Sequence, residues 1–162
     1  MINLSNCAND KPLIDPFCGT GGILIEGADM GLKVTGIDLK EKMIEFSKGN
    51  LKHYGFKGKL INSDFKELSN LEFGSIVCDP PYGIASTSGG ENISELMKRG
   101  LDVFQKCMEN KQRLVVAVSD SRIIKHENLT QIYKFEWYIH KSLTRNIICL
   151  LYTSDAADDV IS

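Results

Sequence analysis

The chain has 162 residues, of which 43% are hydrophobic and 25% are charged, and its formal net charge at pH 7 is −2. This length and composition predict one soluble globular domain with a substantial core. No apolar run approaches the roughly 18 residues of a membrane span, and no basic leader precedes an apolar stretch, so we expect no membrane association. The negative net charge disfavours phosphate-driven binding of nucleic acid by this chain alone, so either the substrate is small or another domain holds the nucleic acid.

The cysteines are widely scattered along the chain and include no CxxC pair; they are Cys7, Cys18, Cys78, Cys107 and Cys149. This spacing predicts neither a disulfide framework nor a zinc site. We expect reduced thiols in a cytoplasmic protein and no metal. Cys18 lies in a glycine-rich loop, but no histidine is near it in the sequence, so a nucleophilic role is not favoured.

Short apolar runs alternate with helical patterns, which predicts βαβ units and a mostly parallel sheet. The predicted strands cover residues 13–15, 33–37, 59–62, 74–78, 114–118, 132–140 and 145–152. The predicted helices cover residues 22–30 and 40–54 and a segment that starts near Asn92, where Asn92 and Glu95 resemble a capping box. Only a short stretch separates the last two strands, so we expect them to form an antiparallel pair at one edge.

The helix after Asn92 carries an apolar stripe on one face. Its members are Ile93, Leu96, Met97, Leu101, Phe104, Cys107 and Met108. A stripe at this spacing is typical of a helix that packs on a core, so we predict core packing for it and no contact with a cofactor.

The first strand-to-helix turn is rich in glycine and reads Asp15-Pro16-Phe17-Cys18-Gly19-Thr20-Gly21-Gly22. Glycines allow the backbone to approach a ligand closely, and ligands bind at the carboxyl ends of parallel strands. Asp38 ends the second strand, where a carboxylate can bind both ribose hydroxyls of an adenosine. A dinucleotide-binding enzyme shares these features, but its GxGxxG fingerprint requires a small residue where Leu24 stands.

Two further segments follow predicted strands. Asp64 and Phe65 come after the third strand, where Asp64 can accept a hydrogen bond from the adenine amino group and Phe65 can pack on the ring; the alternative is an Asx turn. Asp79-Pro80-Pro81-Tyr82 follows the fourth strand. Asp79 and a backbone carbonyl of Pro80 or Pro81 can accept the hydrogens of an exocyclic amine, while Tyr82 can stack on an extruded base. The alternative here is a rigid turn without chemistry.

The four segments, in this order after successive strands, resemble the S-adenosylmethionine-dependent methyltransferases. The resemblance implies an α/β, Rossmann-like fold with a mostly parallel central sheet and an antiparallel edge pair, and S-adenosylmethionine as cofactor. The cofactor-binding residues that it implies are Asp15, Phe17, Gly19, Gly21, Asp38, Asp64 and Phe65. The catalytic residues that it implies are Asp79, Pro80, Pro81 and Tyr82.

A narrower resemblance rests on the segments Asp15–Glu26, Asp79–Gly83 and His140–Arg145. Together they resemble the THUMP-containing tRNA guanosine N2-methyltransferases, and the archaeal-type enzymes that act on guanosine 10 look most similar. This resemblance implies methyl transfer to the exocyclic N2 of a tRNA guanosine by a monomer, with the tRNA held by a THUMP region outside this chain. Two alternatives remain open: an amino-methyltransferase acting on adenine or cytosine of rRNA or DNA, and an inactive cofactor-binding fragment.

Both ends of the chain depart from the family pattern. We expect residues 1–148 to be a methyltransferase domain that is truncated at both ends. The segment from Cys149 to Asp158 resembles a translated sequencing-adapter read-through, so residues 149–162 are expected to be a non-native tail.

Overall fold

The computed structural model describes residues 1–8, 10–81, 92–140 and 143–154. Within these residues seven strands form one sheet: β1 (Leu13–Asp15), β2 (Val34–Asp38), β3 (Lys59–Asn62), β4 (Ser75–Cys78), β5 (Arg113–Val118), β6 (Leu129–His140) and β7 (Leu143–Tyr152). The helices are α1 (Ile2–Ser5), α2 (Gly22–Asp29), α3 (Glu41–His53) and α4 (Ile93–Cys107), with short 3₁₀ helices η1 (Phe65–Asn70) and η2 (Ser121–Ile123).

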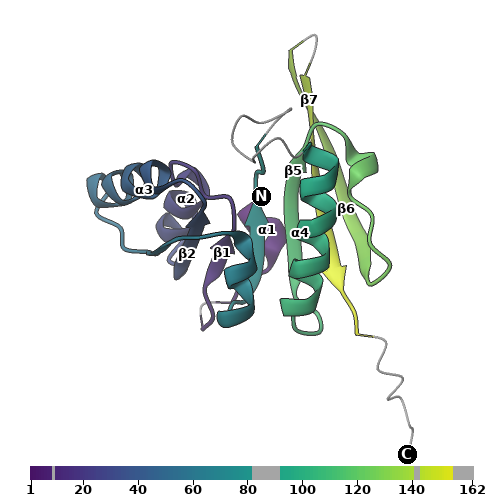
Figure 1. Ribbon diagram of the computed structural model, residues 1–162, viewed down its shortest axis with the longest axis horizontal. Coiled ribbons are helices and arrows are strands. Elements are labelled where there is room, and N and C mark those ends of the chain that lie inside the picture. Colours follow the sequence, from purple (N-terminus) through teal and green to yellow (C-terminus); the bar gives the residue numbers. More distant parts are fainter. Residues whose placement is uncertain (9, 82–91, 141–142, 155–162) are drawn as a thin grey trace, which may run out of the picture.

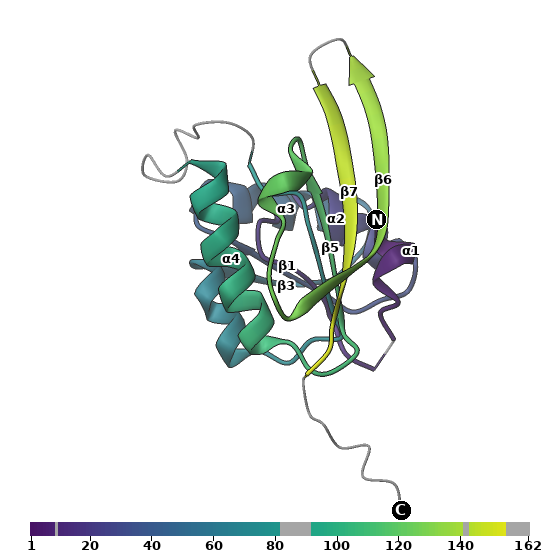
Figure 2. The ribbon, with the colours of Figure 1, turned by 90° about the vertical axis from the view of Figure 1, so that its right-hand side faces the viewer.

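The strands are arranged in the order β3-β2-β1-β4-β5-β7-β6, so β1 and β2 lie toward one side of the molecule and β5, β7 and β6 toward the other (Figure 1). The first five pair in parallel, while β7 lies antiparallel between β5 and β6. The predicted mostly parallel sheet with an antiparallel edge pair is therefore confirmed. The two long strands β6 and β7 extend beyond the rest of the sheet (Figure 2).

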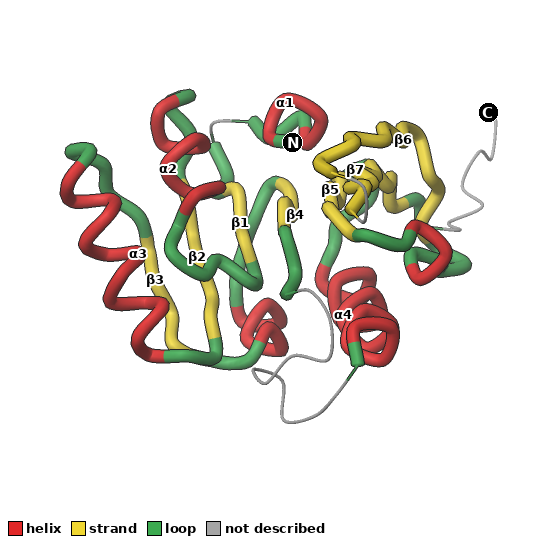
Figure 3. Tube along the Cα trace, turned by 90° about the horizontal axis from the view of Figure 1, so that it is seen from above, coloured by secondary structure: helices red, strands yellow, loops and turns green. Residues whose placement is uncertain are grey.

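Helices cover both faces of the sheet (Figure 3). Side chains alternate along each strand, so Leu13 of β1 and Val77 of β4 pack with α1, whereas Ile14 and Ile76 join the core under α4 and η1. A third apolar cluster joins α2 and α3 to β2 and includes Leu24, Val34 and Leu51. The strands β1, β4 and β5 are thus buried between two layers, which explains their largely apolar sequences.

The helix α4 begins with the predicted capping box. The Glu95 amide donates to Asn92 Oδ1 at 3.0 Å, and the Asn92 amide donates to Glu95 Oε2 at 3.3 Å. The predicted core packing of the stripe is observed, since five of its seven members are buried in the main core and Ile93 and Cys107 pack against it.

The element boundaries differ from the predictions mainly at the C-terminal hairpin. β6 begins at Leu129, earlier than predicted, because Leu129 pairs with Tyr152 at the end of β7. The segment expected to be a non-native tail starts inside β7, where Cys149 and Leu151 are paired with β5. Residues 155–162 lie outside the described part of the chain. None of the helices formed by the described residues is long and apolar enough to cross a membrane.

Candidate functional site

The glycine-rich turn after β1 is held against β2 and α3. The Cys18 amide donates to the Ile37 carbonyl at 2.9 Å, and Gly19 and Gly21 adopt φ angles of +51° and +88°. A Cβ at Gly21 would lie 2.4 Å from Ser47 Oγ on α3. Both the positive φ and the close approach of α3 therefore require glycine at position 21.

Asp38 ties this turn to the end of β2. Its Oδ2 accepts a hydrogen bond from the Gly19 amide, and its Oδ1 accepts one from the Lys40 amide, both at 2.9 Å. An ionised carboxylate has about four acceptor positions, so each oxygen can accept a further hydrogen bond. The Asp38 carboxylate is thus fixed in orientation and can still receive two ligand hydroxyls.

Asp15 is buried, and its Oδ1 accepts a hydrogen bond from the Phe17 amide at 3.0 Å. Burial raises the pKa of the Asp15 carboxyl to about 8; the Phe17 hydrogen bond opposes this rise, and the charges of Asp79 and Asp38 add to it. Asp15 is consequently protonated at neutral pH, and its hydrogen bond with the Phe17 amide stabilises the glycine-rich turn.

A cavity of about 490 Å³ opens beside these elements, at the carboxyl ends of β1, β2, β3 and β4. It brings together seven of the residues singled out in the sequence: Phe17, Gly19, Asp38, Asp64, Phe65, Asp79 and Pro81. The other residues that line it are Pro16, Leu39, Lys40, Met43, Ser63, Leu96 and Arg99. Asp15, Gly21 and Pro80 are not among the lining residues, and Tyr82 lies outside the described residues.

Asp64 and Phe65 follow β3, as predicted. Asp64 Oδ1 accepts a hydrogen bond from the Lys66 amide at 3.0 Å and thereby caps η1, so the Asx-type turn considered for this position is present. Its Oδ2 lies 3.4 Å from Arg99 Nη1. The Phe65 ring is 3% exposed and packs with Phe17 and Phe104, with centroid separations of 5.4 and 5.7 Å.

Arg99 was not predicted as a site residue. Its guanidinium carbon lies 4.4 Å from the centroid of the Phe65 ring, within the range of a cation–π contact. Leu96 and Arg99 are three residues apart on α4, so both lie on the edge of the helix that faces the cavity. In the sequence, Arg99 lies one helical turn after Leu96 of the apolar stripe. The helical period places Arg99 at the edge of the stripe, but it does not show which part of the protein that edge faces.

Asp79 follows β4 and contacts Arg145 of β7. Arg145 Nη2 lies 2.6 Å from Asp79 Oδ1 and 2.5 Å from Oδ2. Arg145 belongs to the segment His140–Arg145 that carried the narrower resemblance, but it was not predicted to contact Asp79. Because β7 runs antiparallel to β5, its first residues pair with the last residues of β5 and lie close to the end of β4.

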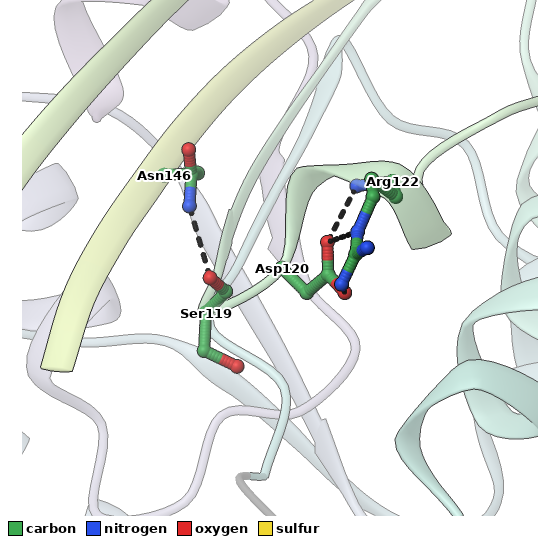
Figure 4. Close-up of polar contacts among 4 residues, drawn as sticks. All are labelled: Ser119, Asp120, Arg122 and Asn146. Carbon is green, nitrogen blue, oxygen red and sulfur yellow. Dashed lines mark hydrogen bonds and ion pairs between the residues drawn. The ribbon is translucent and has the colours of Figure 1, made fainter. Parts of the chain in front are cut away.

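The neighbouring residue Asn146 fixes this part of β7 to β5. Asn146 is 6% exposed, and its Nδ2 donates to the Ser119 carbonyl at 3.0 Å, just beyond the end of β5 (Figure 4).

The same view shows Asp120 and Arg122, an arginine–carboxylate pair with a shortest N–O distance of 2.7 Å. Arg122 is 85% exposed and is not among the residues that line the cavity.

The described residues contain no cluster of three or more His, Cys, Asp and Glu side chains that could hold a metal ion. Burial raises the pKa of the Cys18 thiol, so a thiolate is not formed at neutral pH.

Comparisons with known proteins place the chain in a family. Residues 1–131 match the UPF0020 family, described as the RMKL-like methyltransferase domain. A tRNA (guanine(10)-N2)-dimethyltransferase from Methanothermobacter thermautotrophicus is 36% identical over 152 residues, which cover 91% of this chain and 45% of that protein. A protein from Methanothermococcus thermolithotrophicus, named probable tRNA (guanine(10)-N2)-dimethyltransferase, is 40% identical over 157 residues, covering 91% of this chain and 92% of that protein.

The fold is also similar to solved structures. The structure of SMU.472 complexed with SAH superposes with a TM-score of 0.76 and 20% identity, covering 94% of this chain and 51% of that chain. The chain spans about half the length of the first relative above and nearly all of the second. On the family match and these identities, the chain belongs to the UPF0020 family of RMKL-like methyltransferase domains.

Proposed function

We propose that this chain transfers a methyl group from S-adenosylmethionine to the exocyclic N2 of a guanosine in tRNA, at guanosine 10. One observation carries the proposal: a single cavity is lined both by Asp38 and Asp64, the predicted donor-site acids, and by Asp79 of the acceptor motif. The names of the two relatives support the choice of guanine N2 and of tRNA.

The cavity suits a nucleoside. Its volume of about 490 Å³ lies within the range of about 300–1,000 Å³ that is usual for small-molecule sites. Asp38 is positioned to receive the ribose hydroxyls, and Asp64 to accept from the adenine amino group. S-adenosylmethionine, when bound, supplies an electrophilic methyl group whose transfer breaks its bond to sulfur and forms one to N2.

Asp79 would activate and orient the accepting amine. The lone pair of the guanine N2 is delocalised into the ring, so the amine is a weak nucleophile. Hydrogen bonds from its N–H groups to Asp79 and to a carbonyl of Pro80 or Pro81 would favour a more pyramidal nitrogen. The Arg145 amino group contacts both Asp79 oxygens and so orients the carboxylate that would accept from the amine. Tyr82, which lies outside the described residues, would stack on the base.

One proton must leave the amine for each methyl group gained. Asp79 would accept it, directly or through a water molecule, and pass it to solvent. Because the chemistry needs little beyond alignment and this proton transfer, positioning of the base supplies most of the rate acceleration.

The proposal is tested by methyl transfer from labelled S-adenosylmethionine to a panel of tRNA, rRNA and DNA substrates. We expect N2-methylguanosine in tRNA digests and its loss when guanosine 10 is replaced by adenosine. Methylated adenine or cytosine in rRNA or DNA would instead support the alternative amino-methyltransferase. Cofactor binding in calorimetry without transfer to any substrate would support an inactive cofactor-binding fragment.

The wider setting is also part of the proposal. We propose a cytoplasmic protein in which this chain is the catalytic domain and a THUMP region binds the tRNA. We also propose that the protein is a monomer and that its reaction uses no metal. The relative of which this chain covers 45% has room for a THUMP region, whereas the relative of which it covers 92% does not. Light scattering during gel filtration tests the monomer, and undiminished methyl transfer in a chelator is expected if no metal takes part.

A further inference from the structure

The outer edge of the molecule, formed by α3 and β3, carries a concentration of positive charge. Between Lys33 and Lys59 the sequence has seven lysines and three carboxylates, although the whole chain has a formal net charge of −2. All seven lysines are exposed. We call them the lysine strip: Lys33, Lys40, Lys42, Lys48, Lys52, Lys57 and Lys59.

The carboxylates of this segment do not neutralise the strip. Asp38 is bonded to the Gly19 and Lys40 amides at the cavity, and Glu41 and Glu45 lie in the first half of α3. No acidic residue occurs between Glu45 and Asp64. In the part of the chain that the structure describes, none of the seven lysines forms an ion pair with a carboxylate.

The strip follows a path that starts at the cavity. Lys40 lines the cavity, and α3 then runs for 13 residues, or about 20 Å, along the edge of the sheet (Figure 3). At the far end Lys33, Lys57 and Lys59 surround a shallow hollow of about 470 Å³. The Tyr54 side chain, at the end of α3, is 60% exposed.

We infer that the lysine strip binds the phosphate backbone of the RNA whose target base enters the cavity. This inference rests on the proposed function, and it assigns an RNA-contacting surface to this chain itself. Lysines that form no ion pair with a carboxylate release counterions when they meet a linear polyanion, which drives association. A strip about 20 Å long that ends at a cavity matches a nucleic-acid strand, whereas a small anion would use only one end of it. Tyr54 adds a ring face on which a base can stack.

The test neutralises three lysines away from the cavity, in the variant Lys48→Gln/Lys52→Gln/Lys57→Gln. Glutamine keeps a good helix propensity in α3. The matched control, Lys106→Gln/Lys111→Gln/Lys125→Gln, removes the same total charge from exposed lysines on and beyond α4. Binding of a fluorescent tRNA transcript is measured by anisotropy between about 50 and 200 mM salt.

We expect the strip variant to bind tRNA roughly tenfold more weakly, with the slope of log K against log salt reduced by about two to three. Its KM for tRNA should rise while kcat and the affinity for S-adenosylmethionine stay unchanged, and the control should behave as the wild type. Equal effects of the two triple variants would overturn the inference. So would binding to phosphatidylserine vesicles in the absence of any binding to RNA.

The two proposals can fail separately. Salt-dependent tRNA binding that needs the strip, without methyl transfer to any substrate, would sustain the inference and refute the proposed function. If the strip variant methylates tRNA as well as the wild type does, the proposed function is sustained and the inference is refuted.

Discussion

Arg145 and Asp79 are 66 positions apart in the sequence, yet one guanidinium nitrogen of Arg145 bridges both carboxylate oxygens of Asp79. The contact joins the antiparallel hairpin to the end of the parallel part of the sheet. It fixes the rotation of the carboxylate that, in the proposed reaction, must face the accepting amine.

Replacing Arg145 by methionine should lower kcat for tRNA methylation at least tenfold, because Asp79 loses the contact that orients it. The affinity for S-adenosylmethionine should not change, and Arg145→Lys should restore part of the activity. Arg122→Met, which breaks the exposed pair with Asp120 (Figure 4), is the matched control and should be as active as the wild type. Unchanged kcat in Arg145→Met would show that the contact has no role in turnover.

Asp79→Asn should abolish methyl transfer, since the amide offers a single acceptor and cannot take a proton. Cofactor affinity should stay within about tenfold, or roughly 1.4 kcal/mol, because the donor-site contacts come from other strands. Single-turnover assays and calorimetry measure the two effects. Turnover retained in this variant would remove Asp79 from the reaction.

Asp38→Asn should weaken the binding of S-adenosylmethionine. Hydrogen bonds to a charged group are worth about 1.5–3 kcal/mol, so we expect a loss of roughly ten- to a hundredfold in calorimetric affinity. Asp29→Asn, at an exposed acid that does not line the cavity, serves as the control. The same affinity in both variants would argue against a ribose contact for Asp38.

Gly21→Ala should destabilise the fold by about 1–3 kcal/mol, because alanine at a φ of +88° is strained and its Cβ would collide with Ser47 Oγ. Gly22→Ala is the neighbouring control: nothing lies within 4 Å of a Cβ there, and alanine favours the first turn of α2. Urea unfolding compares the two. Similar midpoints would contradict the close packing of the glycine turn against α3.

The raised pKa of Asp15 makes stability depend on pH. The folded carboxyl titrates near pH 8, whereas an unfolded aspartate titrates near pH 4. Between these values the unfolded state binds fewer protons, so the free energy of unfolding should fall as pH rises from about 4 to 8. The slope is at most roughly 1.4 kcal/mol per pH unit.

Asp15→Asn removes this titration and keeps an oxygen for the Phe17 amide. The variant should therefore gain stability relative to the wild type as pH rises across the same window. Urea unfolding at pH 5, 6.5 and 8 measures the difference; parallel pH profiles would show that Asp15 does not titrate as described.

The sequence by itself determined most of the helices and strands and the positions that form the proposed donor side of the site. Apolar runs predicted the strands, Asn92 and Glu95 predicted the start of α4, and Asp38 and Asp64 were placed at strand ends from the order of elements alone. These features depend on local backbone chemistry and on the rule that parallel strands present their carboxyl ends together. The structure adds that Asp64 both caps η1 and lines the cavity.

Only the tertiary structure decided which distant side chains meet. The contact of Arg145 with Asp79 requires that β7 insert between β5 and β6, and the packing of Arg99 on Phe65 requires a particular rotation of α4 over the sheet. Hydrophobic periodicity shows which face of an element is buried, but not which partner covers the remaining edge. The proposed donor site is assembled from residues next to strand ends and could be foreseen, whereas the proposed acceptor site depends on contacts between segments far apart in the chain.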